Sequence, residues 1–97
     1  MIYLKNEDLN EIIKEGNYLI DFYAEWCGPC KMLEPILEKI KEKINIIKIN
    51  VDNHRTLAQE YKVMSIPTIM FFKDGDKKTE LIGFQNIETL EEIVNNL

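Results

Sequence analysis

A near-continuous apolar run, YLIDFYA at residues 18–24, limits the folds open to this chain more than any other feature. The run is bounded by turn residues, and its composition is typical of a β-strand that is buried on both faces. Strands of this kind belong to parallel or mixed sheets whose two faces are covered by helices. The run therefore predicts a sheet with helices on both sides.

The remaining segments alternate between strand and helix patterns. Strands are expected at 2–4, 18–24, 45–50, 66–72 and 77–83, and helices at 6–16, 28–43, 53–61 and 87–97. Asn6 is expected to cap the first helix and Gly16 to end it, whereas Asp74 and Gly75 signal a hairpin turn. The order βαβαβαββα predicts one α/β domain over residues 1–97, whose central mixed sheet combines parallel strands with a C-terminal antiparallel hairpin and is flanked by four helices.

Composition narrows the range of partners. The chain has 97 residues, of which 45% are hydrophobic and 30% charged, and its formal net charge is −5. An acidic chain without a basic cluster is not expected to bind nucleic acid or an anionic membrane. No apolar run approaches the ~20 residues that cross a bilayer. The first residues, MIYLKNED, lack the apolar region of a secretory signal, so a cytoplasmic protein is expected.

Both cysteines of the chain, Cys27 and Cys30, lie within FYAEWCGPCKM at residues 22–32, and three structural explanations compete with a catalytic one. A structural disulfide across so small a ring gains only about 2 kcal/mol, compared with about 3 kcal/mol for a fifteen-residue loop. Half of a zinc site would need two more ligands, but the only histidine, His54, lies in a polar stretch and is expected at the surface. Two unrelated buried thiols would not explain the Gly-Pro spacer at the junction of a strand and a helix.

A reversible dithiol explains the placement better. The strand that ends at Ala24 brings Cys27 to the start of a helix, where unpaired backbone amides and the positive end of the helix dipole favour a thiolate. This effect is worth up to ~2 kcal/mol and would lower the pKa of the thiol from its usual ~8.5. Pro29 suits the first helical turn, and Cys30 follows one turn later, close enough to close a disulfide.

Four segments and one glycine together resemble the thioredoxin family, and they span nearly the whole chain. LIDFYAEWCGPCKMLEPIL at 19–37 is similar to the family's active-site strand and helix, and KINVD at 48–52 is similar to its next strand. SIPT at 65–68 is similar to the loop that carries the family's cis-proline, FFKDG at 71–75 to its hairpin, and Gly83 to a glycine near the substrate surface. A CxxC motif near a βαβ pattern is itself a sign of a thioredoxin-like redox site. The resemblance implies the thioredoxin fold.

The resemblance also implies a general protein disulfide reductase that works through a redox-active Cys27–Cys30 disulfide. Cys27 is expected to attack a target disulfide as the nucleophile, and Cys30 to resolve the mixed disulfide. Asp21 is expected beneath the cysteines as the group that transfers a proton, with Lys48 as its partner. From the apolar pattern alone, an edge-strand or solvent-facing position of these two residues stays open. Burial would raise the pKa of Asp21.

A surface that binds protein substrates follows from the same resemblance. The residues expected in it are Trp26, Gly28, Pro29, Ile66, Pro67 and Gly83. The Ile66–Pro67 peptide bond is expected to be cis and to turn the backbone of Ile66 toward the thiols. Two residues depart from the family pattern: Tyr23 stands where tryptophan is common, and Phe84 where a smaller residue is common. Neither touches the chemistry, although Phe84 would tune the choice of partner.

The implied partners are a thioredoxin reductase and disulfide-containing protein substrates. No bound cofactor or metal is expected, because an external reductase supplies the electrons. The chain is expected to be a cytoplasmic monomer that takes part in electron transport and cell redox homeostasis. Two other functions stay open: a binding or scaffold module of the same fold whose partners need the surface but not the thiols, and a specialised thiol oxidant or isomerase. The Gly-Pro spacer favours a reductase over an oxidant or isomerase of the same fold.

Overall fold

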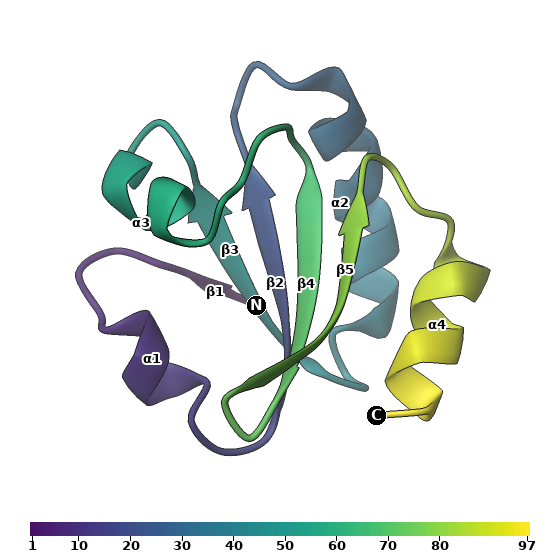
Figure 1. Ribbon diagram of the computed structural model, residues 1–97. Coiled ribbons are helices and arrows are strands. Elements are labelled where there is room, and N and C mark those ends of the chain that lie inside the picture. The colour runs from purple at the N-terminus through teal and green to yellow at the C-terminus, as the bar shows by residue number, and fades with distance from the viewer.

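The computed structural model describes all of residues 1–97 and contains one five-stranded mixed sheet with helices on both faces (Figure 1). The strands are β1 (Ile2–Tyr3), β2 (Asn17–Tyr23), β3 (Asn45–Asn50), β4 (Thr68–Lys73) and β5 (Asp76–Ile82), and the helices are α1 (Leu9–Ile12), α2 (Gly28–Ile40), α3 (Arg55–Glu60) and α4 (Ile87–Asn95). This order of elements confirms the prediction. None of the helices combines the length and apolar character needed to span a membrane.

The strand that contains the long apolar run, β2, lies at the centre of the sheet. The strand order is β1-β3-β2-β4-β5, with β2 parallel to β3 and antiparallel to β4. The carboxyl end of β2 leads into α2, and the chain then returns to form β3. This connection is the helical crossover that parallel neighbours require.

Side chains of β2 alternate between two hydrophobic cores, one on each face of the sheet. Ile20 belongs to the core that α1 and α3 cover, whereas Leu19 packs with Leu33 of α2 and Leu90 of α4. Figure 1 shows α1 and α3 on one side of the sheet and α2 and α4 on the other. Because strand residues alternate in direction, Asp21 shares the α2 face with Leu19. The fold therefore directs a carboxylate into the core beneath α2.

The first helix is shorter than predicted. Its N-cap is Asp8, whose side chain accepts a hydrogen bond from the Asn10 N–H at 3.0 Å. The prediction of Asn6 as the cap was wrong, because the aspartate that directly precedes the buried Leu9 satisfies the free amide. Gly16 does not end the helix either; it lies beyond it at φ +100°, a left-handed backbone conformation that favours glycine.

The hairpin and the loop before β4 agree with the prediction, apart from one boundary. Asp74 and Gly75 form the turn with φ values of 49° and 85°, as a two-residue hairpin of the right twist requires. The strand β4 begins at Thr68, so Ile66 and Pro67 lie in the preceding loop and not in the strand. The Ile66–Pro67 peptide bond is cis, as expected.

His54 is not the solvated surface residue that its polar neighbours predicted. Its side chain is half-buried, and Nε2 lies 3.0 Å from the Leu4 carbonyl oxygen, a hydrogen bond in the tautomer that carries its proton on Nε2. Leu4 in turn donates its N–H to the Lys48 carbonyl oxygen at 2.9 Å. His54 therefore ties the N-terminal segment to the start of α3.

Candidate active site

The two cysteines lie where β2 passes into α2. Cys27 is the N-cap of α2, and its Sγ accepts a hydrogen bond from the backbone N–H of Cys30 at 3.2 Å. The two residues are joined by a disulfide, with their Cα atoms 5.3 Å apart. Pro29 occupies the first turn, where a missing N–H leaves no helical hydrogen bond unmade. The fold thus brings the pair together in the way that the spacing predicted.

The surroundings of Cys27 favour a negatively charged sulfur once the disulfide is reduced. The first turn of α2 directs unpaired N–H groups and the positive end of the helix dipole toward this residue. From the loop before β4, the Ile66 carbonyl oxygen lies 3.8 Å from Cys27 Sγ. A disulfide sulfur carries no hydrogen, so this contact becomes a hydrogen bond only when Cys27 is a thiol, and it then favours the protonated form and opposes the helix dipole.

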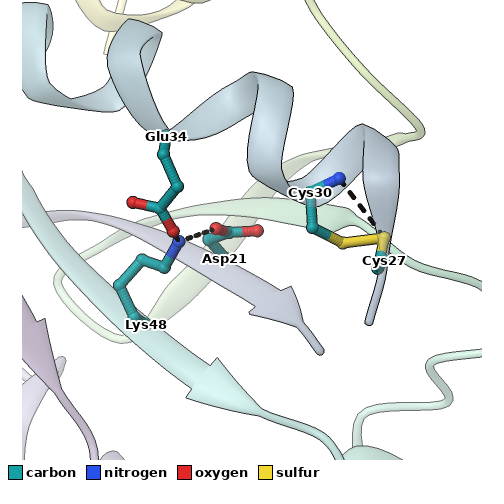
Figure 2. A network of polar contacts seen from close by, with 5 residues as sticks. All are labelled: Asp21, Cys27, Cys30, Glu34 and Lys48. Carbon is teal, nitrogen blue, oxygen red and sulfur yellow. Dashed lines mark hydrogen bonds and ion pairs between the residues drawn. A yellow bond between two sulfur atoms is a disulfide. The ribbon is translucent and has the colours of Figure 1, made fainter. Parts of the chain in front are cut away.

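Asp21 and Lys48 form a buried ion pair on the α2 face of the sheet. They are register partners on β2 and β3, and Asp21 Oδ2 lies 2.7 Å from Lys48 Nζ. Both side chains have 0% exposure, so the hypothesis of an edge or solvent-facing position is wrong for both. In the view of Figure 2, the Asp21 carboxylate lies between the Lys48 ammonium and the disulfide.

A third charged residue, Glu34, was not foreseen from the sequence. It lies on α2 one turn beyond Cys30, and its Oε1 contacts Lys48 Nζ, so the ammonium group contacts two carboxylates (Figure 2). The Tyr23 ring also packs on this group, with Lys48 Nζ 4.4 Å from the ring centroid. The signal that could have identified Glu34 is its spacing of four residues from Cys30, which places both on one face of the helix.

Burial and charge act in opposite directions on this cluster. Burial raises the pKa of Asp21, the Lys48 ammonium works against the rise, and Glu34 adds to it; the net direction is upward. Burial lowers the pKa of Lys48, but Asp21 and Glu34 outweigh this effect and the net direction is again upward. Neither oxygen of Asp21 accepts a hydrogen bond of regular geometry, so the ion pair is the main contact that stabilises its charge. Lys48 is therefore a cation at neutral pH, beside a carboxylate with raised proton affinity.

Trp26 stands beside Cys27 on the surface, with 70% of its area exposed. Its Nε1–H donates a hydrogen bond to Asp52 Oδ2 at 2.9 Å, which fixes the orientation of the indole ring. Gly28 and Pro29, which were predicted to share this surface, are also exposed. Asp52 is the second residue that was not foreseen from the sequence. It follows β3, whose carboxyl end lies at the same edge of the sheet as that of the parallel strand β2.

The loop before β4 lies against the same region. Ile66 is half-buried and contacts Cys27 through its carbonyl group, whereas Pro67 is buried. The Gly83 N–H donates a hydrogen bond to the Pro67 carbonyl oxygen at 2.8 Å. Gly83 has a φ of +89°, which favours glycine, although a Cβ at this position would meet no atom within 4 Å. These contacts connect the three residues to the disulfide.

Two pockets adjoin the motif. One, of about 400 Å³, has a mostly apolar lining that includes Trp26, Ile66 and the exposed Met64. The other, of about 250 Å³, has Cys30 and Glu34 in its wall. The largest pocket of the molecule, about 560 Å³, is lined mainly by residues of β5 and α4 and by none of the motif. The pocket beside Trp26 therefore has the most apolar lining of the three.

The structure offers no further ligands that would complete a zinc site at the cysteine pair. No group of three or more His, Cys, Asp or Glu side chains lies in positions that could hold a metal ion. His54 lies instead against the backbone of Leu4.

Comparison with known proteins identifies relatives over nearly the whole chain. The family model described as thioredoxin matches residues 1–96. A thioredoxin of Chlamydia caviae is 42% identical over 92 residues, covering 92% of this chain and 90% of its relative. A thioredoxin of Staphylococcus epidermidis is 40% identical over 99 residues, covering 98% and 95% of the two chains.

Solved structures give the same result. A mutant thioredoxin from Halobacterium salinarum has a TM-score of 0.90 at 35% identity, covering 98% of this chain and 88% of its own. The oxidised form of mitochondrial thioredoxin 3 from Saccharomyces cerevisiae has a TM-score of 0.82 at 37% identity, covering 91% and 86%.

Proposed function

Because the chain belongs to the thioredoxin family, we propose that it is a general protein disulfide reductase whose working group is the Cys27–Cys30 pair. The family and the cysteine pair together make it a thiol–disulfide oxidoreductase with a redox-active disulfide. The observation that carries the proposal is the position of this disulfide at the start of a 13-residue helix, with Cys27 as the cap and Cys30 one turn inside. This position favours a thiolate at Cys27 and keeps Cys30 within reach of it.

The first step is attack on the target. In the reduced protein, the Cys27 thiolate attacks one sulfur of a target disulfide, whose S–S bond breaks as the new bond forms. The leaving target sulfur departs as a thiolate and takes up a proton. The product is a mixed disulfide between Cys27 and the target.

The second step releases the target. Cys30 loses its proton to the Asp21 carboxylate and attacks Cys27 Sγ, so the mixed disulfide breaks and the Cys27–Cys30 disulfide forms. The second target sulfur leaves as a thiolate and receives the proton from Asp21. Two electrons have then passed from the cysteine pair to the target disulfide, which is now a dithiol.

Three features support Asp21 as the group that transfers this proton. Its carboxylate is buried on the α2 face, its pKa is raised by burial against the opposing charge of Lys48, and no regular hydrogen bond occupies its oxygens. A carboxylate tuned toward neutrality is an effective acid and base near neutral pH. Lys48, as its partner, limits the cost of the buried charge.

We further propose that substrates bind over the surface around the disulfide. The residues proposed to contact them are Trp26, Gly28, Pro29, Ile66, Pro67 and Gly83. The exposure of Trp26 and the adjoining apolar pocket support this assignment. An extended substrate segment could pair with the backbone of Ile66, as in β-strand addition.

An external donor must return to the cysteine pair the two electrons that each cycle transfers to the target. We propose that a thioredoxin reductase reduces the Cys27–Cys30 disulfide, and that the protein works without a bound cofactor. We also propose that residues 1–97 form a single domain that acts as a monomer in the cytoplasm. A reducing compartment suits a pair that must return to its dithiol form after each cycle.

The proposal is tested by following reduction of a disulfide-bonded test protein in the presence of dithiothreitol, which regenerates the pair. The wild-type protein should accelerate reduction, whereas the double variant Cys27→Ser, Cys30→Ser should not exceed dithiothreitol alone. If the double variant still performed the cellular function, the scaffold hypothesis would replace reduction. If the oxidised protein passed its disulfide to reduced proteins more readily than it was regenerated, an oxidant or isomerase would be favoured.

A further inference from the structure

The proposed mechanism of disulfide exchange involves Asp21 and Lys48 but not Glu34. This glutamate nevertheless contacts the same ammonium group as Asp21, from the helix that holds the cysteines (Figure 2). The two carboxylates differ in their surroundings, because Asp21 is fully buried while the Glu34 side chain is 35% exposed. One cation is thus shared between a buried and a partly solvated anion.

We propose that Glu34 is a positioning residue for disulfide exchange, which shares the Lys48 ammonium with Asp21 and thereby determines how strongly Asp21 holds a proton. The inference rests on the proposed role of Asp21 in taking up the proton of Cys30. If Lys48 paired with Asp21 alone, the full attraction of the cation would favour the carboxylate and make it a weak base. Glu34 draws part of that attraction to itself and repels the charge on Asp21, so both effects raise the proton affinity of Asp21.

No other carboxylate is placed to share Lys48 with Asp21. The other charged residues of α2 (Lys31, Glu38 and Lys39), as well as Glu25 before α2 and Lys73 of β4, are exposed at the surface. The ionisable groups that face Asp21 are Lys48 on β3, Glu34 and the two cysteines on α2, Tyr23 on its own strand and Tyr3 on β1. The register partner on β4 is Ile69, which is apolar. Among these groups, Glu34 is the one carboxylate besides Asp21. Repulsion from its charge is also one of the causes that raise the pKa of Asp21.

Glu34 lies at the wall of a pocket, whereas Asp21 lies in the core. Glu34 and Cys30 both line the pocket of about 250 Å³ beside α2. The Glu34 side chain is 35% exposed, so its negative charge is partly solvated and less costly than that of a fully buried group. Glu34 therefore acts on Asp21 through Lys48 without entering the core.

The primary test measures Asp21 directly. Glu34→Gln removes the charge and keeps the shape, and the ¹³C chemical shift of the Asp21 carboxyl carbon is followed against pH in the oxidised protein, where neither cysteine titrates. The Asp21 titration should move to lower pH. The matched control is Glu38→Gln, one turn further along α2, where Glu38 pairs with the exposed Lys41 at 2.8 Å. This control should leave the Asp21 titration unchanged, and an unchanged titration in Glu34→Gln would overturn the inference.

A second measurement links the titration to exchange. In single-turnover experiments, release of the target from its mixed disulfide should slow about threefold in Glu34→Gln near pH 8, because part of a general-base contribution of roughly 10²–10⁴-fold is lost. The acid limb of its pH–rate profile should move to lower pH. A shifted titration with an unchanged rate would overturn the proton-transfer role of Asp21, and with it the role of Glu34 in exchange. If the titration stayed fixed while Asp21→Asn slowed release, only the inference about Glu34 would fail.

A double-mutant cycle tests the route through Lys48. Glu34→Gln is introduced into a Lys48→Met background, and the shift of the Asp21 titration is compared with that in the wild-type background. The shift should be smaller without Lys48. An equal shift would show that Glu34 acts on Asp21 by direct repulsion alone, which contradicts the sharing of the ammonium group.

Discussion

Asp21 Oδ2 and Lys48 Nζ lie 2.7 Å apart on neighbouring parallel strands, and neither side chain is exposed to solvent. Burying two charges is costly even when they attract each other, and apolar residues of similar volume often give a more stable core. The pair lies beneath the helix that begins at the disulfide (Figure 2). The cost of this pair and its position beneath the helix support the proposed role of Asp21 in proton transfer.

The first prediction concerns stability. Burial raises the pKa of Asp21 in the folded protein, although Lys48 opposes the rise, whereas in the unfolded chain it stays near ~4. The folded state therefore suffers no penalty below the unfolded pKa; the penalty grows as pH rises above it and levels off beyond the folded pKa. Asp21→Asn should raise the free energy of unfolding at neutral pH, by about 1.4 kcal/mol for each unit by which folding raises the pKa of Asp21, since Glu34 still pairs with Lys48. Denaturant unfolding at pH 7 and pH 3 should show a gain at pH 7 that disappears at pH 3.

The second prediction concerns the rate in the same variant. Asp21→Asn should slow resolution of the mixed disulfide by about tenfold or more, because a positioned base typically contributes 10²–10⁴-fold. Rapid-quench analysis should show mixed disulfides that persist, while the initial attack by Cys27 changes little. A variant that is less stable and exchanges at the wild-type rate would identify Asp21 as a purely structural residue.

The third prediction concerns substrate contact. Trp26 is exposed beside Cys27 and is held by Asp52, so Trp26→Ala should raise KM for protein disulfides by about tenfold, as expected for an aromatic contact at an interface. A small aromatic disulfide, which needs no extended surface, should react at nearly the wild-type rate. Asp52→Asn should have a weaker effect in the same direction. Equal losses toward both kinds of substrate would contradict a role of Trp26 in binding.

The fourth prediction concerns His54, which contacts Leu4 and no part of the motif. His54→Ala should lower the free energy of unfolding by about 1 kcal/mol, the typical value of one hydrogen bond, without changing the rate of disulfide exchange. Amide hydrogen exchange should show faster opening of the N-terminal segment. A loss of exchange activity in the folded variant would show that this contact does more than hold β1.

The fold was predictable because the apolar residues of its strands and helices follow clear patterns. The run at 18–24 has to be buried on both faces, and the spacing of apolar residues in 28–40 and 87–95 distinguishes helices from strands. The cysteine pair was also predictable, since strand, Gly-Pro spacer and helix are contiguous in the chain.

Two kinds of feature could not be predicted: contacts between residues far apart in the sequence, and the helix cap where two similar residues were both suitable. Asn6 and Asp8 are both good caps, and packing of the following turn decides between them. The contact of His54 with Leu4 spans 50 positions, so no local pattern indicates it. Glu34 was overlooked because a glutamate on an amphipathic helix looks like a solvated charge until Lys48 is seen beneath it.

The most direct test of disulfide exchange through Cys27 is to trap the mixed disulfide and locate it. Reduced Cys30→Ser is incubated with a disulfide-bonded protein, and the adduct is mapped by peptide mass spectrometry under non-reducing conditions. The adduct should accumulate through Cys27 and persist, because a serine hydroxyl in place of the Cys30 thiol cannot resolve it, whereas Cys27→Ser should form no productive complex. Normal release of product by Cys30→Ser, or productive turnover by Cys27→Ser through an adduct at Cys30, would contradict these roles.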